Sequence, residues 1–313
     1  MERRVRGEDG RRLLCPAPCG AVADSPAKQQ NCDSCPGAGG VVESRCMQPT
    51  PTSRPSRAYR KPGFRHDGFL VSELVKRDFK VRYDRSVLGM FWCVLQPTLT
   101  MGLLYAVFSL FFKSAIPNFP LYLISGIVFY QFFVETTTTA MRSIQENAGL
   151  ITKVKVPLWT YPVTRAVSSL VNFLFALVPL FCVVLLTRVP LRSTMLLLFY
   201  STACMLFFAL GVGLFLAALA VFFSDVKFLW GFACMLFMYA TPIFYPEEVL
   251  MRGHHWMVYF NPIYHMVHFS RVVLNGRVPP FEAFAACAVF AAVSFALGIV
   301  FFRSLRNKFA LQL

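Results

Sequence analysis

One pair of opposite charges interrupts the apolar side of a basic segment. Asp78 and Arg82 lie four residues apart, and a helix would place them one turn apart on the side that also carries Leu74, Val75 and Phe79. A lone charge there would be costly, whereas an i,i+4 pair of opposite charges is tolerable. Asp78 and Arg82 are therefore expected to act through ionic contacts. The pair either extends to polar headgroups, as long charged side chains often do, or contacts another protein element.

Histidines gather in the segment 241–280. His254, His255, His265 and His268 would be suitable ligands for a metal ion. Histidine and aromatic side chains also commonly lie at a water–lipid boundary, and we prefer this interpretation. We therefore expect no metal site in this segment.

The first part of the chain contains a CxxxC and then a CxxC, a spacing found in zinc sites. Residues 1–58 nevertheless contain no Phe, Tyr or Trp and are rich in Arg, Pro, Gly and Ser, a composition that folds poorly by itself. We predict a disordered leader over residues 1–58, or a start assigned too early with Met47 as the true start. We expect no metal there either.

Polar residues also stand out inside apolar segments. Glu135 has Arg142 two helical turns further on, and Arg165 has Asn172 at the same separation. Because such residues are costly inside a membrane, each pair is either a structural contact or a gating contact.

Motifs of the common enzyme classes are absent from the sequence. It contains no GxxxxGK[ST] phosphate loop, so the chain cannot itself hold ATP in the usual way. It also lacks paired acidic residues at DxD spacing, HExxH and GxSxG. We therefore expect no catalytic residue and no cofactor in this chain, and favour a conduit that is driven from elsewhere.

The composition indicates a membrane protein. Of 313 residues 56% are hydrophobic, including 33 Phe, and the mean hydropathy is +0.53, values too apolar for one soluble core of this length. The formal charge of +15 would suggest nucleic acid in a soluble protein. Much of it lies in residues 1–58 and beside apolar segments, where membrane topology explains it, so we expect no nucleic-acid partner.

The elements that must position these residues are helices. We predict an all-α polytopic membrane protein with an amphipathic interface helix over 70–83, in the plane of the membrane surface. Six apolar segments of bilayer length follow: 88–112, 120–140, 158–186, 194–223, 226–245 and 281–302. The connection FFSDVKFL is very short, so a fused hairpin is the main alternative to six spans. Residues 59–313 would form this transmembrane domain.

Lys and Arg in the connections predict the orientation. They are more frequent around the interface helix, residues 141–157 and the C-terminal end than on the opposite side. By the positive-inside rule both termini lie in the cytoplasm.

Two connections are long. Residues 141–157 read as a short helix with Gly149 as a possible stop, and their mixed charged and apolar residues suit a partner's groove or a solvated loop. Residues 246–280, on the outer side, are too apolar for a free loop and too rich in Pro for one helix. We predict a pair of short helices that dip into the outer leaflet.

Aromatic residues form 15% of the chain. Some of them could line a conduit for sugar rings, whose apolar faces stack on aromatic side chains, although packing and lipid contact are the commoner roles. The candidates for such a lining are Trp92, Tyr105, Phe129, Tyr130, Phe133 and Tyr239.

The chain resembles the permease subunits of type-2 ABC exporters, in the polysaccharide and polyol-phosphate branch that includes teichoic acid and O-antigen exporters. The resemblance runs from about Glu73 to the C-terminus. Its carriers are RDFKVRYDRSVLGMFWCVLQP, SIQENAGLITKVKVPLWTYPV, FFSDVKFL, TPIFYPEEV and NPIYHMVHFSRVVLNG. The leader and its cysteines have no counterpart in the family pattern.

The resemblance implies a homodimer of six-helix subunits with two copies of a separate ATPase, which would hold the ATP and Mg. It implies three sets of functional residues. A coupling helix that contacts the ATPase would include Ser143, Gln145, Glu146, Asn147, Leu150 and Lys153. The interface helix would include Asp78, Arg82 and Tyr83, and an outer gate would include Tyr245, Pro246, Asn261, Pro262 and Arg271.

The function predicted in this way is ATP-driven export of a lipid-linked polysaccharide or teichoic acid-type polymer across the cytoplasmic membrane. Export of a drug or another lipid by a related permease is one alternative. A membrane-bound enzyme acting on lipid-linked sugars is a weaker one, because the apolar segments offer essentially only Glu135 and Glu282 as acidic groups.

Overall fold

The computed structural model describes residues 64–83, 89–112, 116, 118–151, 156–189 and 193–309. Within these residues every regular element is a helix, which confirms the predicted all-α class for this part of the chain. The predicted leader, residues 1–58 with Met47, lies outside the described residues. The elements are α1 (Phe64–Tyr83), η1 (Gly89–Phe91), α2 (Trp92–Phe112), α3 (Phe119–Glu146), α4 (Ala148–Ile151), α5 (Thr160–Leu186), η2 (Ser193–Leu196), α6 (Leu197–Phe222), α7 (Val226–Ala240), α8 (Glu247–Phe260), α9 (Pro262–Leu274) and α10 (Phe281–Phe309).

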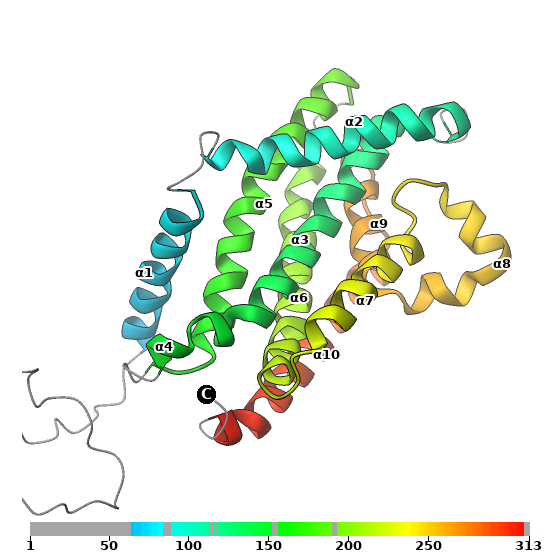
Figure 1. Ribbon diagram of the computed structural model, residues 1–313. Coiled ribbons are helices and arrows are strands. Elements are labelled where there is room, and N and C mark those ends of the chain that lie inside the picture. Colours follow the sequence, from blue (N-terminus) through cyan, green and yellow to red (C-terminus); the bar gives the residue numbers. More distant parts are fainter. Residues whose placement is uncertain are drawn as a thin grey trace, which may run out of the picture. The chain divides into compact units, whose positions relative to one another are not determined.

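Four long helices form the body of the transmembrane unit (Figure 1). α3 packs against α5 and α6, and α6 packs against α10. α3 is the most enclosed of the long helices, with 72% of its most apolar stretch buried, compared with 6% for α2. α2 crosses over α3 and α5, and α1 lies beside α5 (Figure 1). α3 is therefore the element against which most of the others are placed.

Five helices are long and apolar enough to cross a membrane: α2, α3, α5, α6 with its preceding η2, and α10. The remaining predicted span, 226–245, which is the fifth along the chain, is shorter than expected. Its helix α7 ends at Ala240, where Thr241 is extended, as residues that precede a proline tend to be. Fifteen helical residues extend about 22 Å, less than the roughly 30 Å of a bilayer core.

The connection between the second and third predicted spans also differs from expectation. We predicted a span that ends near residue 140 and then a separate short helix, but α3 continues without a break to Glu146 and only α4 follows separately. No Gly or Pro interrupts the chain between Ala140 and Glu146. The Ser143 hydroxyl donates to the Ala140 carbonyl at 2.6 Å, so its polar group is satisfied within the helix. The predicted residue Lys153 lies outside the described residues, and so does the side chain of Leu150.

Two short helices, α8 and α9, occupy the outer segment that we expected to form a helix pair. Asn261 separates them, and its side-chain oxygen accepts from the backbone N–H groups of Ile263 and Tyr264 at 3.1 and 3.3 Å. Pro262 occupies the first turn of α9, where its missing N–H costs nothing. An Asn-Pro sequence thus ends one helix and starts the next.

α6 and α10 approach each other through facing glycines. A Cβ at Gly211 would lie 2.5 Å from the Ser294 carbonyl, and a Cβ at Gly298 would collide with the Gly211 backbone. Small residues permit such close backbone contact between helices in a membrane. Backbone atoms cannot rotate away, so a side chain at either position must separate the two helices.

Replacing Gly298 by Ala should therefore destabilise the subunit by about 1–3 kcal/mol, as overpacking does. Thermal unfolding of the purified subunit in detergent measures the effect. Gly102→Ala on α2 is the matched control, because nothing lies within 4 Å of a Cβ there. An unfolding temperature for Gly298→Ala equal to that of the control would contradict the close packing.

Candidate functional site

A cavity of about 770 Å³ opens between α2, α3, α5 and the chain just after α7. Among the described residues, its wall combines aromatic side chains with polar side chains, of which Glu135 alone carries a carboxyl group. The aromatic members are Trp92, Tyr130, Phe132, Phe173 and Phe244, and the polar members include Gln96, Thr100, Gln131, Glu135, Thr138, Thr139 and Asn172. Amides both donate and accept hydrogen bonds, while aromatic rings offer apolar faces. Such a wall suits a ligand that carries hydroxyl groups on an otherwise apolar ring.

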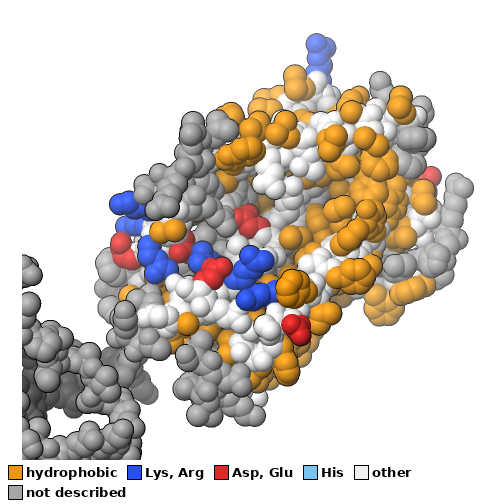
Figure 2. All heavy atoms as spheres, in the orientation of Figure 1, with side chains coloured by type: hydrophobic (Ala, Val, Ile, Leu, Met, Phe, Trp, Pro, Cys, Tyr) orange, Lys and Arg blue, Asp and Glu red, His pale blue; other side chains and the backbone are white. Residues whose placement is uncertain are grey.

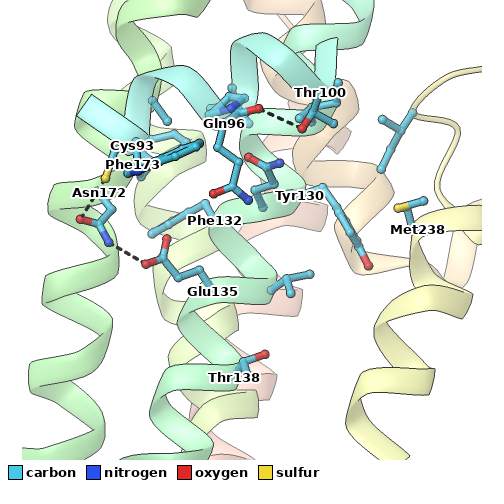
Figure 3. Close-up of a pocket in the computed structure, with 18 of the residues that line it drawn as sticks. Cys93, Gln96, Thr100, Tyr130, Phe132, Glu135, Thr138, Asn172, Phe173 and Met238 are labelled. Atoms are coloured by element: carbon cyan, nitrogen blue, oxygen red, sulfur yellow. Dashed lines mark hydrogen bonds between the residues drawn. The ribbon is translucent and has the colours of Figure 1, made fainter. Parts of the chain in front are cut away.

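Glu135 of α3 and Asn172 of α5 point toward each other in the wall of this cavity (Figure 3). The Asn172 amide donates to the Glu135 carboxylate at 2.6 Å, and the Cys93 thiol contacts the Asn172 carbonyl oxygen at 3.6 Å. α2, α3 and α5 are thereby joined at one level. Arg142, which we considered as the partner of Glu135, is exposed on α3.

The predicted conduit aromatics divide into three groups. Trp92 and Tyr130 line the cavity. Phe129 and Phe133 are fully buried, Phe129 against Phe173 and Phe133 against several core rings. Neither lines the cavity, and their place in a conduit stays a prediction. Tyr105 packs near Phe119 and Tyr239 is half exposed; neither contributes to the cavity wall.

Sequence reasoning missed the polar stripe of α3. Gln131, Glu135 and Thr138 lie at intervals of four and three residues, which places them on one helix face. All three line the cavity. This periodicity inside an apolar span was the available signal.

A second set of polar contacts lies between α1, α5 and the end of α3. The Asp78 carboxylate lies 3.2 Å from Arg165, Arg165 lies 2.9 Å from Glu146, and Arg77 donates to Asn147 at 2.8 Å. Figure 2 shows charged side chains gathered in this region, whereas hydrophobic side chains cover most of the same face. Asp78 thus contacts its own subunit. The side chains of Arg82 and Tyr83 lie outside the described part, so the Asp78–Arg82 pair stays a prediction.

The predicted coupling residues do not share one surface. Ser143 is fully buried, and Asn147 is nearly so, with its amide donating to the Ser143 carbonyl at 2.8 Å. Gln145 donates to the Ala220 carbonyl of α6. Of the described members only Glu146 is exposed. The side chains of Ser143 and Asn147 hold the corner of α3 together, and coupling of this segment to an ATPase stays a prediction.

A third set of contacts centres on Arg271 of α9, which is buried. Its guanidinium donates to the Pro242 carbonyl at 2.8 Å and to Glu247 at 3.3 Å, and it lies 3.5 Å from the ring centroid of Tyr122. Gly126 provides the space, since a Cβ there would lie 2.7 Å from the guanidinium. Arg271 therefore attaches the α8–α9 pair to α3.

Glu247 is the anionic partner in this third set. It accepts from His268 at 3.0 Å and from Tyr264 at 3.0 Å. Burial raises the pKa of Glu247, but the hydrogen bond from His268, the charges of His268 and Arg271 and the hydrogen bond from Tyr264 outweigh it, so the pKa is lowered overall. Burial and the nearby carboxylate raise the pKa of Tyr264, which keeps its hydroxyl a donor.

The other predicted gate residues have structural contacts. The Tyr245 hydroxyl donates to the Tyr239 carbonyl at 2.6 Å, and Pro246 precedes the first residue of α8. Among the residues that the structure describes, no group of three or more His, Cys, Asp or Glu could hold a metal ion. The side chains of His254 and His255 are outside that part.

These features can now be set beside known proteins. A family model described as ABC-2 type transporter matches residues 70–275. The chain belongs to the ABC-2 type transporter family. Membership implies a membrane location and an ABC ATPase partner. The match includes α1 from Leu70 onward, the cavity and both outer helices.

Relatives of this ABC-2 transporter are similar over nearly their whole length. An O-antigen export system permease protein RfbA from Myxococcus xanthus is 29% identical over 79% of this chain and 96% of the relative. A protein of the same description from Klebsiella pneumoniae is 27% identical over 78% of this chain and 95% of its own. The polysialic acid transport protein KpsM from Escherichia coli is 20% identical over 78% and 96%.

Replacing Arg271 by Ala in this transporter should cost about 1–3 kcal/mol of stability, because the partly buried Glu247 carboxylate loses its guanidinium partner and keeps, among the described residues, only His268 and Tyr264. The loss would be measured by thermal unfolding in detergent. Arg277→Ala, at an exposed position just after α9, is the control and should change little. Equal unfolding temperatures for the two variants would contradict the anchoring role.

Acid should weaken the same contact. A carboxylate whose pKa is lowered in the folded state stabilises the fold at neutral pH, and this contribution is lost as pH falls below the ordinary value of about 4.3 and through the lowered pKa. Between pH 7 and pH 3, Glu247→Gln should therefore lose less thermal stability than the wild type. Glu248→Gln, at an exposed neighbour, should follow the wild type. Parallel curves for all three proteins would argue against this role of Glu247.

Proposed function

We propose that this ABC-2 transporter is the permease subunit of an ATP-driven exporter that moves a lipid-linked polysaccharide across the cytoplasmic membrane. The observation that carries the proposal is the cavity wall, in which Gln96, Gln131 and Asn172 alternate with Trp92 and Phe173. Amides and hydroxyls match the hydroxyls of a sugar, and aromatic rings match its apolar faces. The printed functions of the O-antigen and polysialic acid relatives support the same substrate class.

The working unit that we propose is a homodimer with two copies of a separate ATPase, in which ATP and Mg are bound. The outward faces of α2 and α7 support a second copy. Large apolar side chains are exposed there, including Leu99, Leu103 and Leu110 on α2 and Phe228, Leu229 and Phe232 on α7. Lipid or a second subunit must cover them, and we propose that a second subunit covers part of them.

The proposed topology counts α7 with the turn that follows it as the fifth of six spans. Both termini then lie in the cytoplasm. α4, the end of α10 and the turn between α6 and α7 lie toward one end of the bundle (Figure 1), as this topology requires. The α3–α4 corner would meet the ATPase, with Glu146 and Arg142 exposed, and α8 and α9 would form the outer gate.

Export of a drug or another lipid is the alternative within the same family. Such a substrate would have little use for the hydrogen-bonding groups that α3 turns into the cavity, namely Gln131, Glu135 and Thr138. Their presence favours a polymer rich in hydroxyl groups.

The test is transport by the permease together with its ATPase in lipid vesicles that contain a lipid-linked polysaccharide. The wild-type complex should move polymer only when ATP is present. Gln131→Leu should lower export about tenfold, because the hydrogen bonds of one amide are lost, whereas Gln131→Asn keeps the amide and should retain most of it. Transport by the permease without any ATPase, or no transport of any polysaccharide by the intact complex, would overturn the proposal.

A further inference from the structure

Arg165 joins three helices at the cytoplasmic end of the bundle. It lies in the first turns of α5. One guanidinium nitrogen lies 3.2 Å from the Asp78 carboxylate of α1, and the other lies 2.9 Å from the Glu146 carboxylate at the end of α3. The Asp78 side chain is only 9% exposed and that of Arg165 21%, so solvent screens this contact much less than an ordinary surface pair.

A second contact runs parallel to the first. Arg77, the neighbour of Asp78 on α1, donates to the Asn147 side chain at 2.8 Å. Asn147 is buried and is itself bonded to Ser143 of α3. α1 therefore contacts the α3–α4 corner directly through Arg77 and indirectly through Arg165. Two contacts prevent α1 from rotating freely about either one.

The face of α5 that carries Arg165 also carries a residue of the cavity wall. Asn172 follows Arg165 by two helical turns, about 10 Å along the axis, and donates to Glu135 in the cavity wall. A displacement of Arg165 along α5 would therefore move a residue that lines the cavity. Arg165 is the member of this chain of contacts that touches both α1 and the α3–α4 corner.

We propose that Arg165 is a positioning residue that transmits movement of the α3–α4 corner to α1 and along α5 to the cavity. The inference rests on the proposed function, in which this corner receives the ATPase. Arginine suits the role because its planar fork presents two nitrogens to two carboxylates at once. A lysine at this position has a single charged nitrogen and could bind only one of the two carboxylates well. Through Arg165, the effect of the ATPase on the α3–α4 corner would depend on the position of the amphipathic helix α1.

The experiment measures polymer exported per ATP hydrolysed by the full permease–ATPase complex in vesicles. Arg165→Gln should keep assembly and ATP hydrolysis while this ratio falls about fivefold or more, which corresponds to coupling energies typical of contacting residues. Arg165→Lys should fall between the wild type and Arg165→Gln. Lys76→Gln is the matched control on α1, because Lys76 is exposed and pairs only with its near neighbour Glu73 among the described residues; it should leave the ratio unchanged.

Asp78→Asn and Glu146→Gln extend the test and replace it if Arg165→Gln fails to insert. Each should lower the ratio, and each should add little when combined with Arg165→Lys or Arg165→Gln, because the variants interrupt the same path. An unchanged ratio in these variants would overturn the inference, and so would additive losses or export and ATP hydrolysis falling in parallel. The proposed function fails differently, since the wild-type complex would then export no polysaccharide.

Discussion

Hydrocarbon offers no hydrogen-bonding partner and no screening for charge, and the whole structure depends on this constraint. Backbone groups are satisfied inside helices, and charged side chains are placed where another protein group compensates them. Asp78 meets Arg165, and Glu247 meets Arg271. Each compensation joins helices that are distant in sequence. The polar contacts that make burial tolerable therefore also hold these helices together.

α3 is the element through which these contacts communicate. Near its start, Tyr122 and Gly126 receive the Arg271 guanidinium. In its middle, Glu135 binds Asn172 in the cavity, and at its end Glu146 binds Arg165. One continuous helix thus touches the α8–α9 pair, the cavity and the α3–α4 corner. A buried rod with close packing on most sides transmits a tilt rather than absorbing it, which suits a transporter that must link events on two sides of a membrane.

The close packing of α6 on α10 makes this helix pair a rigid part of the subunit. Gly211 and Gly298 let the two backbones touch, and such a contact has little freedom to slide. α2 and α7 have the opposite character, with large apolar side chains facing outward. The molecule therefore combines a rigid body with two exposed helices that can adapt to lipid or to a second subunit.

The amino-acid sequence by itself determined the helical class, most of the membrane spans and the amphipathic helix, because apolar periodicity and segment length are local properties. The family came from the motifs that the chain shares with it. It did not determine where helices end or meet. α3 runs on to Glu146 because nothing breaks it, while α7 stops before Pro242. Phe129 and Phe133 were indistinguishable in sequence from Trp92 and Tyr130, yet the first two pack in the core and the others face the cavity. The partners of Asp78 and Glu135, Arg165 and Asn172, lie on another helix. Only the tertiary structure decided these pairings, since they depend on how helices rotate and cross, which neighbouring residues do not encode.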